Sequence, residues 1–287
     1  MYHSSHSNTI CMKTIVAATD FSKVSINAVY YAAEMARYLK KNLTILHVCE
    51  LPPVATEVPV PAYDIVPILE AAERDIKVIK EEITNKITNC PTIFTEVRIG
   101  SVTSQLKDYC DTIPVYAVVM GINGNSEGTS RFLFGSKTLE ALNQLKSPLI
   151  VVPAGVAFSA IERVGLASDF VNVSRTIPFY EIKDLVKELH ADLHILHIKQ
   201  KKGSGINDEM SDEFRVFRDL MRDLNPAYHI IHRDNIEAGI DELVKMLEID
   251  LLIVVPGKHT GLEKIFHKSH TRQLTLAAQV PILSIHE

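Results

Sequence analysis

The sequence repeats itself. The stretch "VAATDFSKVS" at residues 16–25 returns as "GLASDFVNVS" at 165–174, and "LTILHV" at 43–48 returns as "LHILHI" at 193–198. "SPLIVVP" at 147–153 is answered by "VPILSIH" at 280–286. Three pairs in the same order indicate one fold written twice, and 287 residues suffice for two domains. We therefore expect a leader at 1–11, a first domain at 12–154, a linker at 155–160 and a second domain at 161–287.

Short apolar runs alternate with helical patterns in each half. In "SINAVYYAAEMARYLKKN" the apolar side chains recur with a period near 3.6, as in an amphipathic helix. Unbroken Val, Ile and Leu runs predict strands covered on both faces, which is typical of parallel sheets. In the first half these runs are Thr14–Thr19, Leu43–Cys49, Phe94–Ile99, Val115–Met120 and Leu149–Val152. The sequence thus predicts two tandem α/β domains, each an open five-stranded parallel sheet with helices on both faces.

Composition limits the classes of partner and compartment. The net charge is −5 and no Lys/Arg cluster stands out, which argues against nucleic-acid binding. No apolar run reaches the roughly 18 residues of a membrane span. Four scattered cysteines and a polar N-terminal stretch without an apolar core favour a reducing compartment. We therefore expect a cytoplasmic protein.

A loop rich in glycine follows the predicted fourth strand. Gly121, Gly124, Gly128 and Gly135 precede a helix that we expect to begin near Ser136, a good N-cap residue. The free amides of a helix N-terminus suit a phosphate, and Arg131 and Lys137 would add charge. The loop is neither a Walker A motif nor the Rossmann fingerprint. Judged on the glycines alone, a tight surface turn and a phosphate cradle both remain open.

These features together resemble the universal stress protein family. The family's nucleotide signature is G-x2-G-x9-G-[ST], and its other marks are an Asp after the first strand, an "LHV" second strand and a terminal "SPLIVVP" strand. The resemblance covers nearly the whole chain, once per half, and implies a Rossmann-like fold. It also implies binding of ATP or AMP, with Mg²⁺ accompanying ATP, and at most weak ATP hydrolysis.

Residues of the first half match the family pattern position by position. The resemblance assigns nucleotide binding to Ala18, Thr19, Asp20, Val48, Met120, Gly121, Gly124, Gly135, Ser136 and Lys137. One departure is that ten residues separate Gly124 from Gly135, where the family has nine, so Asn125 is an alternative second position. For Asp20, a cap of the turn or helix is the alternative to contact with adenosine.

The second half departs further from the signature. In "VVPGKHTGLEKIFHKSHTRQL", at residues 254–274, Lys268 stands where Gly135 would be and Ser269 where Ser136 would be. We expect that the second half binds no ATP and that its role is to pair with the first half. In the family, domains pair through their fifth strands, which implies that "SPLIVVP" and "VPILSIH" meet as an internal dimer. A homodimer of the whole chain is also consistent with the resemblance.

Our leading hypothesis is a stress-response sensor that binds an adenine nucleotide in its first half and is non-catalytic or a very slow ATPase. Other functions are also consistent with the sequence. They are a nucleotide-free scaffold for protein assembly, a true ATPase or nucleotidyl transferase, and a small-molecule or lipid carrier that uses the apolar segment 51–69 as a lid. His194 and His197 are three apart on a predicted strand and should point to opposite faces, so they do not suit one metal ion. His47 and His197 recur at equivalent places, which predicts a structural role. The stretch 232–244 reads as a turn and a helix N-terminus rather than a hydrolase site.

Overall fold

A single mixed sheet crosses the whole molecule. The fold is taken from a computed structural model that describes residues 12–50, 65–124, 132–133, 136–199, 212–255 and 280–285. The strand order is β3-β2-β1-β4-β6-β11-β10-β7-β8-β9, and β5 pairs with β4 outside this path. The expected leader and most of the apolar segment 51–69, namely 51–64, lie outside the described residues.

The five strands predicted for the first half are all present. They are β1 (Thr14–Thr19), β2 (Asn42–Cys49), β3 (Ile93–Ile99), β4 (Val115–Gly124) and β6 (Leu149–Pro153). The second half contributes β7 (Arg163–Ala167), β8 (Asp192–Lys199), β9 (Ala227–His232), β10 (Leu251–Val254) and β11 (Ile282–Ser284). Within each half these strands are parallel. The predicted fold class is confirmed.

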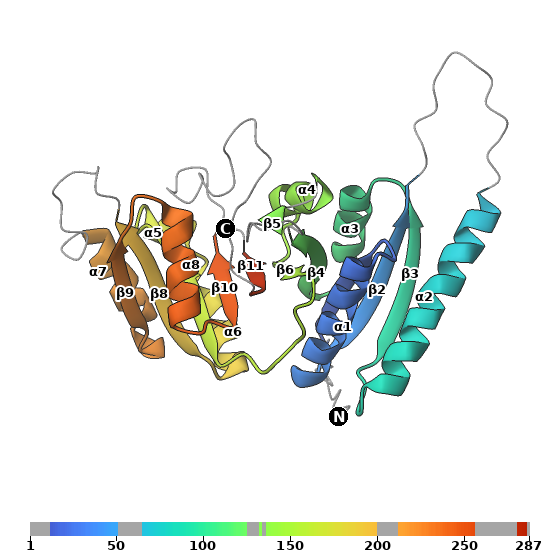
Figure 1. The fold of residues 1–287 in the computed structure, drawn as a ribbon, viewed down its shortest axis with the longest axis horizontal. Helices are drawn as coiled ribbons and strands as arrows, with labels where there is room; N and C mark the ends of the chain where they lie inside the picture. Colours follow the sequence, from blue (N-terminus) through green and yellow to red (C-terminus); the bar gives the residue numbers. More distant parts are fainter. Residues whose placement is uncertain are drawn as a thin grey trace, which may run out of the picture.

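Helices cover both faces of the sheet (Figure 1). One face carries α1 (Lys23–Tyr38), α2 (Val66–Lys86), α5 (Val173–Thr176), α6 (Phe179–Leu189) and α7 (Asp212–Met221), and the other carries α3 (Val102–Cys110), α4 (Ser136–Gln144) and α8 (Ile236–Met246). A 3₁₀ turn, Arg222–Leu224, follows α7. On β1, Ile15 and Ala17 enter one apolar layer while Val16 and Ala18 enter the other. Burial on both faces explains why this strand reads as an unbroken apolar run.

The first helix differs between the halves. In α1 the predicted face is buried along its length, at Val29, Ala33 and Ala36 among others. In the second half the corresponding segment is split into α5 and α6, and Pro178 lies between them. Proline lacks an N–H and its ring clashes with the preceding turn, so a continuous helix is excluded there.

The halves meet at a strand pair. β11 runs antiparallel to β6, with Ile282 opposite Val151 and Ser284 opposite Leu149. The connecting segment 154–162 lies against α1 in the first half, where Phe158 packs edge-on against Tyr31 with ring centroids 5.3 Å apart. Both apolar layers contain residues from each half, so the two halves share their core.

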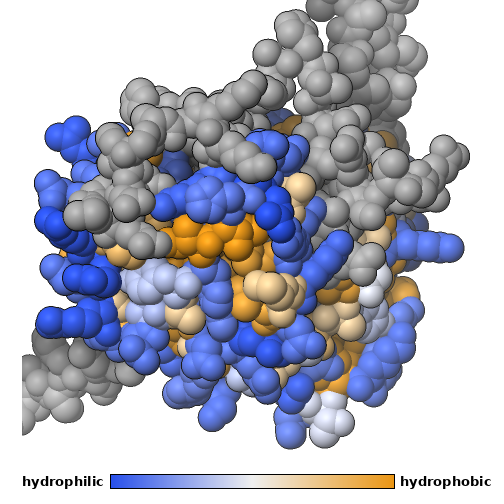
Figure 2. Space-filling model, turned by 60° about the vertical axis from the view of Figure 1, so that its left-hand side comes forward, coloured by the Kyte–Doolittle hydropathy of each residue, from blue (hydrophilic) through white to orange (hydrophobic). Residues whose placement is uncertain are grey.

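The face of the second half that is seen in Figure 2 is mainly hydrophilic. Figure 2 turns this half forward and shows hydrophilic side chains around a hydrophobic patch. Exposed large hydrophobic side chains of this half are Val171, Tyr180, Val216, Leu220 and Met246. Exposed apolar residues are ordinary on globular proteins and assign no function by themselves. Among the described helices, none has the length and apolar character required to cross a membrane.

Candidate functional site

The strand order reverses beside β1, and in open parallel sheets such a reversal is where a ligand crevice forms. From β1 the chain continues to β2 on one side, while β4 lies on the other. Thr19 pairs with His47 on β2, and Ala17 pairs with Val119 on β4, so the carboxyl ends of the three strands lie together. Open parallel sheets bind ligands at such points. We call this edge the first-half crevice.

The turn after β1 is held by its own side chains. Asp20 is exposed, and its Oδ1 accepts a hydrogen bond from the Ser22 amide at 3.0 Å. Partial burial alone would raise the pKa of Asp20, but hydrogen bonds involving Ser22, Ser25 and backbone amides outweigh it and lower the pKa. The expected capping role of Asp20 is therefore present, because the carboxylate closes the turn that leads into α1.

Phe21 and His47 fix the position of this turn. Phe21 has a positive φ of 64°, and its ring stacks on the His47 ring with centroids 4.3 Å apart. His47 Nδ1 lies 2.8 Å from the Thr19 carbonyl oxygen, so the ring donates a hydrogen bond to the end of β1. A side chain in the left-handed region costs free energy, which this stack and hydrogen bond offset.

The second half repeats the same construction. Phe170 has a φ of 55°, packs against His197 at 4.8 Å, and His197 Nδ1 lies 2.8 Å from the Ser168 carbonyl oxygen. The predicted structural role of the two equivalent histidines is confirmed. The role of Phe21 and Phe170 was not predicted, although the repeated "DF" pair was the available signal.

Gly121 has a close neighbour in the protein. A Cβ at this position would lie 2.6 Å from the Val24 carbonyl oxygen of α1, so the glycine is required for packing of α1 on β4. The strand does not end at Gly121 as predicted. It continues to Gly124 and forms a short antiparallel hairpin with β5 (Phe132–Leu133), because residues beyond Met120 still pair with β6.

The second half has a valine at the equivalent position. Ala17 pairs with Val119 and Leu166 pairs with Ile253, so two residues further on Gly121 corresponds to Val255. Val255 is buried in the same apolar layer as Val173 of α5. The first amide of α5 already has an acceptor within the protein, since Val173 N donates to Glu213 Oε2 at 2.8 Å.

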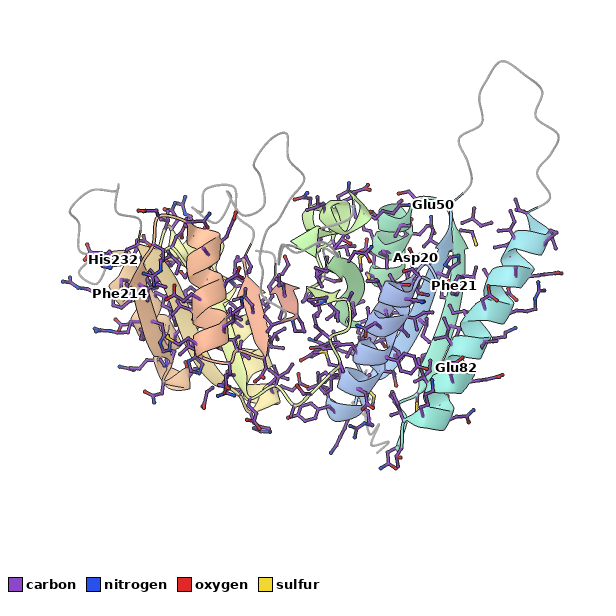
Figure 3. The ribbon with its side chains drawn as sticks, viewed as in Figure 1. Asp20, Phe21, Glu50, Glu82, Phe214 and His232 are labelled. Atoms are coloured by element: carbon purple, nitrogen blue, oxygen red, sulfur yellow. The ribbon has the colours of Figure 1, made fainter. Side chains whose placement is uncertain are left out.

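The helix predicted to begin near Ser136 begins at that residue. Gly135 and residues 125–131 lie outside the described part of the chain, as do Gly261, Lys268 and Ser269. Lys137, in the first turn of α4, forms an ion pair with Glu50, which directly follows β2. Glu50 was not identified from the sequence. The pair links β2 to α4 at the crevice (Figure 3 labels Glu50 and Asp20 at the same end of the first half).

The crevice thus brings together most of the predicted nucleotide residues. Ala18, Thr19, Val48 and Met120 are buried, and Asp20 is exposed. Ala18, Val48 and Met120 belong to one apolar layer. Gly124 lies further along, at the hairpin, where it pairs with Phe132. This edge therefore has buried apolar residues, which we call its floor, and the charged side chains of Asp20, Glu50 and Lys137, which we call its rim.

His194 and His197 of β8 make different contacts. His194 Nδ1 lies 3.0 Å from His229 Nε2 on β9, whereas His197 points to the opposite face of β8 and bonds Ser168. The predicted opposition of His194 and His197 is confirmed. Within the described ranges, no group of three or more His, Cys, Asp or Glu side chains could hold a metal ion. The stretch 232–244 forms a turn and α8, with Asn235 capping Ala238 N at 2.8 Å.

The fold defines the class of protein. The chain has two tandem Rossmann-like domains, and the strand order of the first reverses beside β1. Residues 12–153 match the model of the Universal stress protein family. The chain belongs to the universal stress protein family, as the sequence motifs predicted.

Solved structures with the same architecture include full-length matches. A universal stress protein from Archaeoglobus fulgidus DSM 4304 is 19% identical, with a TM-score of 0.69, covering 95% of this chain and 98% of its own. A protein from Pseudomonas aeruginosa UCBPP-PA14, described as belonging to the same family, is 11% identical with a TM-score of 0.58, covering 96% and 93%. A universal stress protein in complex with cAMP matches half the chain (50% of this chain and 99% of its own), with 18% identity and a TM-score of 0.37. No curated protein sequence matches significantly.

Proposed function

We propose that the first half binds an adenine nucleotide, ATP or AMP, in the crevice formed by β1, β2 and β4. The observation that carries the proposal is the reversal of strand order beside β1, with an apolar floor and a charged rim. Ala18, Val48 and Met120 would contact adenine. Asp20 stays ionised and exposed beside this floor, and its carboxylate would accept hydrogen bonds from ribose hydroxyls.

The phosphates would lie toward α4. The first turn of a helix offers free amides and the positive end of its dipole, and Lys137 adds a cation there. Gly124, Gly135 and Ser136 would surround the phosphates, with Thr19 and Gly121 on the strand side. Mg²⁺ would accompany ATP, bound to its phosphates. Because Asp20 and Glu50 are already engaged by Ser22 and Lys137, neither is positioned as a general base, and the role we propose is nucleotide sensing with hydrolysis slow or absent.

The biological role that follows is a stress-response module in the cytoplasm. Binding would change the surface around the crevice, which unknown partners would read. We further propose that the two halves act as a persistent internal pair through β6 and β11, supported by their antiparallel pairing and by the core they share.

The internal repeat supplies a matched test. Asp20 and Asp169 each accept a hydrogen bond from an amide two residues later, at 3.0 Å in both cases. We expect ATP and AMP to raise the melting temperature of the parent protein, and Asp20→Asn to weaken this shift while Asp169→Asn leaves it unchanged. Gly135→Lys, which copies Lys268, should abolish it.

A nucleotide-free scaffold is the second candidate. Two observations favour it: Gly121 is accounted for by the close approach of Val24, and Lys137 already has an anionic partner. The absence of any thermal shift at millimolar ATP would support this candidate, since a ligand that prefers the folded state must stabilise it.

A further inference from the structure

A small cavity lies at the junction of the two halves, and it shares no residue with the first-half crevice. Its volume is about 130 Å³. Tyr31 of α1 contributes from the first half, Ser159 and Ile161 from the connecting segment, and Ile249, Asp250 and Pro281 from the second half. The segment 154–162 is held over α1 by the Asn27 side chain, which donates to the Val156 carbonyl at 3.0 Å.

Asp250 places a carboxylate in the wall of this cavity. Its Oδ2 accepts two backbone hydrogen bonds, from Glu162 N at 2.9 Å and from Arg163 N at 2.8 Å. Both bonds use the same oxygen, and Oδ1 has no hydrogen-bond partner among the described residues. The two amides hold the carboxylate in place and leave one oxygen to accept a donor from the cavity.

Tyr31 places a hydroxyl beside it. The side chain is only 3% exposed, yet its hydroxyl has no hydrogen-bond partner within the described part of the chain. Burial, together with the nearby Asp250 carboxylate, raises the pKa of Tyr31, so the group is a neutral hydroxyl. The hydroxyl is not among the fully buried polar atoms that lack a partner, so it is open to the cavity, where a ligand or water can bond to it.

The lining selects for positive charge. It contains one carboxylate and two hydroxyls, Tyr31 and the exposed Ser159, while Ile161, Ile249 and Pro281 are apolar. Among the described residues that line the cavity, none has a cationic side chain. A ligand that satisfies this wall carries N–H donors and positive charge at one end and a short hydrocarbon at the other. The volume is close to that of cavities that hold a six-carbon ring, so the ligand has about six heavy atoms or fewer.

We propose that this cavity binds a small primary alkylammonium ion, whose N–H groups donate to Asp250 Oδ1 and to the Tyr31 hydroxyl. The ion contacts both halves at once, so its binding stabilises the junction between them. This site is separate from nucleotide binding and stands or falls independently of it. Water is the competing occupant, because a polar cavity of this size holds roughly four water molecules.

The test uses the full chain with ¹³C-labelled isoleucine methyl groups and n-butylammonium chloride as the probe. Tetramethylammonium chloride is the control ligand, since it has the same charge and number of heavy atoms but no N–H donor. We expect saturable shifts of the Ile161 and Ile249 methyl signals with butylammonium and none with tetramethylammonium.

Two tyrosine variants localise the effect. Tyr31→Phe removes only a hydroxyl that makes no hydrogen bond to the described residues, and we expect it to weaken butylammonium binding by about tenfold or more, as for loss of a hydrogen bond to a charged group. Tyr30→Phe makes the same change at the neighbouring residue, whose hydroxyl bonds Glu82 outside the cavity, and should leave the affinity unchanged. Asp250→Asn should weaken binding further.

Three results would overturn the proposal: methyl shifts that do not saturate, equal shifts with tetramethylammonium, or equal affinity in Tyr31→Phe and the parent. Shifts that do not saturate would mean that water alone fills the cavity, and either of the other two results would mean that binding does not use N–H donation to the Tyr31 hydroxyl. If Asp250→Asn fails to fold, the comparison of Tyr31→Phe with Tyr30→Phe still decides the outcome.

Discussion

Replacing Gly121 by alanine tests the packing at the centre of the first-half crevice. The added Cβ would lie 2.6 Å from the Val24 carbonyl oxygen, 2.9 Å from its carbonyl carbon and 3.0 Å from its Cγ1. Non-bonded heavy atoms are most favourable at roughly 3.5–4.0 Å, so either α1 or β4 has to move by several tenths of an ångström. The two nearest atoms belong to the backbone, so a change of the Val24 rotamer cannot relieve the contact.

The size of the effect follows from two opposing contributions. Overpacking a well-ordered site costs about 1–3 kcal/mol, whereas replacing glycine lowers the entropy of the unfolded chain and returns roughly 0.4–1 kcal/mol. We therefore expect Gly121→Ala to lower the free energy of unfolding by about 1–2 kcal/mol. Because the shift displaces the first turn of α1 beside the crevice, nucleotide affinity should fall with it.

Gly239 provides the matched control. A Cβ there would lie 2.8 Å from Ile198 Cδ1, the far end of a flexible side chain, and Gly239 is inside α8. Alanine gains about 1 kcal/mol of helix propensity over glycine, while a displaced rotamer costs roughly 0.5–1.5 kcal/mol. Gly239→Ala should thus change the free energy of unfolding little. Urea denaturation followed by circular dichroism measures both variants, and equal losses would refute the argument from backbone contact.

Three further predictions concern side chains of the two halves. Glu50→Gln should free Lys137 and tighten ATP binding by about two- to fivefold, the strength of an exposed ion pair, as measured by calorimetric titration; weaker binding would show that Glu50 supports the site instead. The pKa values of His194 and His229 are lowered, first of all by burial, so the unfolded chain binds more protons below the ordinary histidine pKa of about 6.5. The contribution of the two histidines to the free energy of unfolding should therefore be fully present above pH ~6.5 and should decrease as the pH is lowered to 5.5, with a smaller decrease in His194→Gln. A melting temperature that is unchanged over this range would contradict the reasoning. His197→Ala should cost about 1–3 kcal/mol in urea denaturation, because it removes a buried ring and its hydrogen bond to the end of β7, and a loss below 0.5 kcal/mol, the range of roughly neutral surface changes, would argue against the structural role.

The sequence predicted the strands well because their apolar runs reflect burial on both faces. It predicted a structural role for His47 and His197 because the two residues occupy equivalent positions of the internal repeat. A residue that the fold requires is expected to recur in both copies. It did not predict that β4 continues past Gly121, since the pairing partners of that segment, β5 and β6, come later in the chain. A glycine that leaves room for a backbone carbonyl looks the same in sequence as one that leaves room for a phosphate.

Long-range pairs were also beyond the sequence. Glu50 and Lys137 are far apart in the chain, and charged residues at exposed positions give no signal of their partner. The split of α1 into α5 and α6 in the second half was readable in principle from Pro178, because proline cannot continue a helix. The cavity at the junction depends on how three separate segments come together, which no local pattern contains.

The continuity of the sheet determines where another polypeptide strand could add to the protein. Because β6 and β11 use their hydrogen-bonding edges on each other, the path of the sheet through the described residues ends at β3 and β9. β3 carries the charged pair Glu96 and Arg98, joined at 3.0 Å, and charged side chains on an edge strand discourage uncontrolled growth of a sheet. The edges of β6 and β11 therefore form an interior seam, and the described sites of strand addition lie at the two far ends of the sheet.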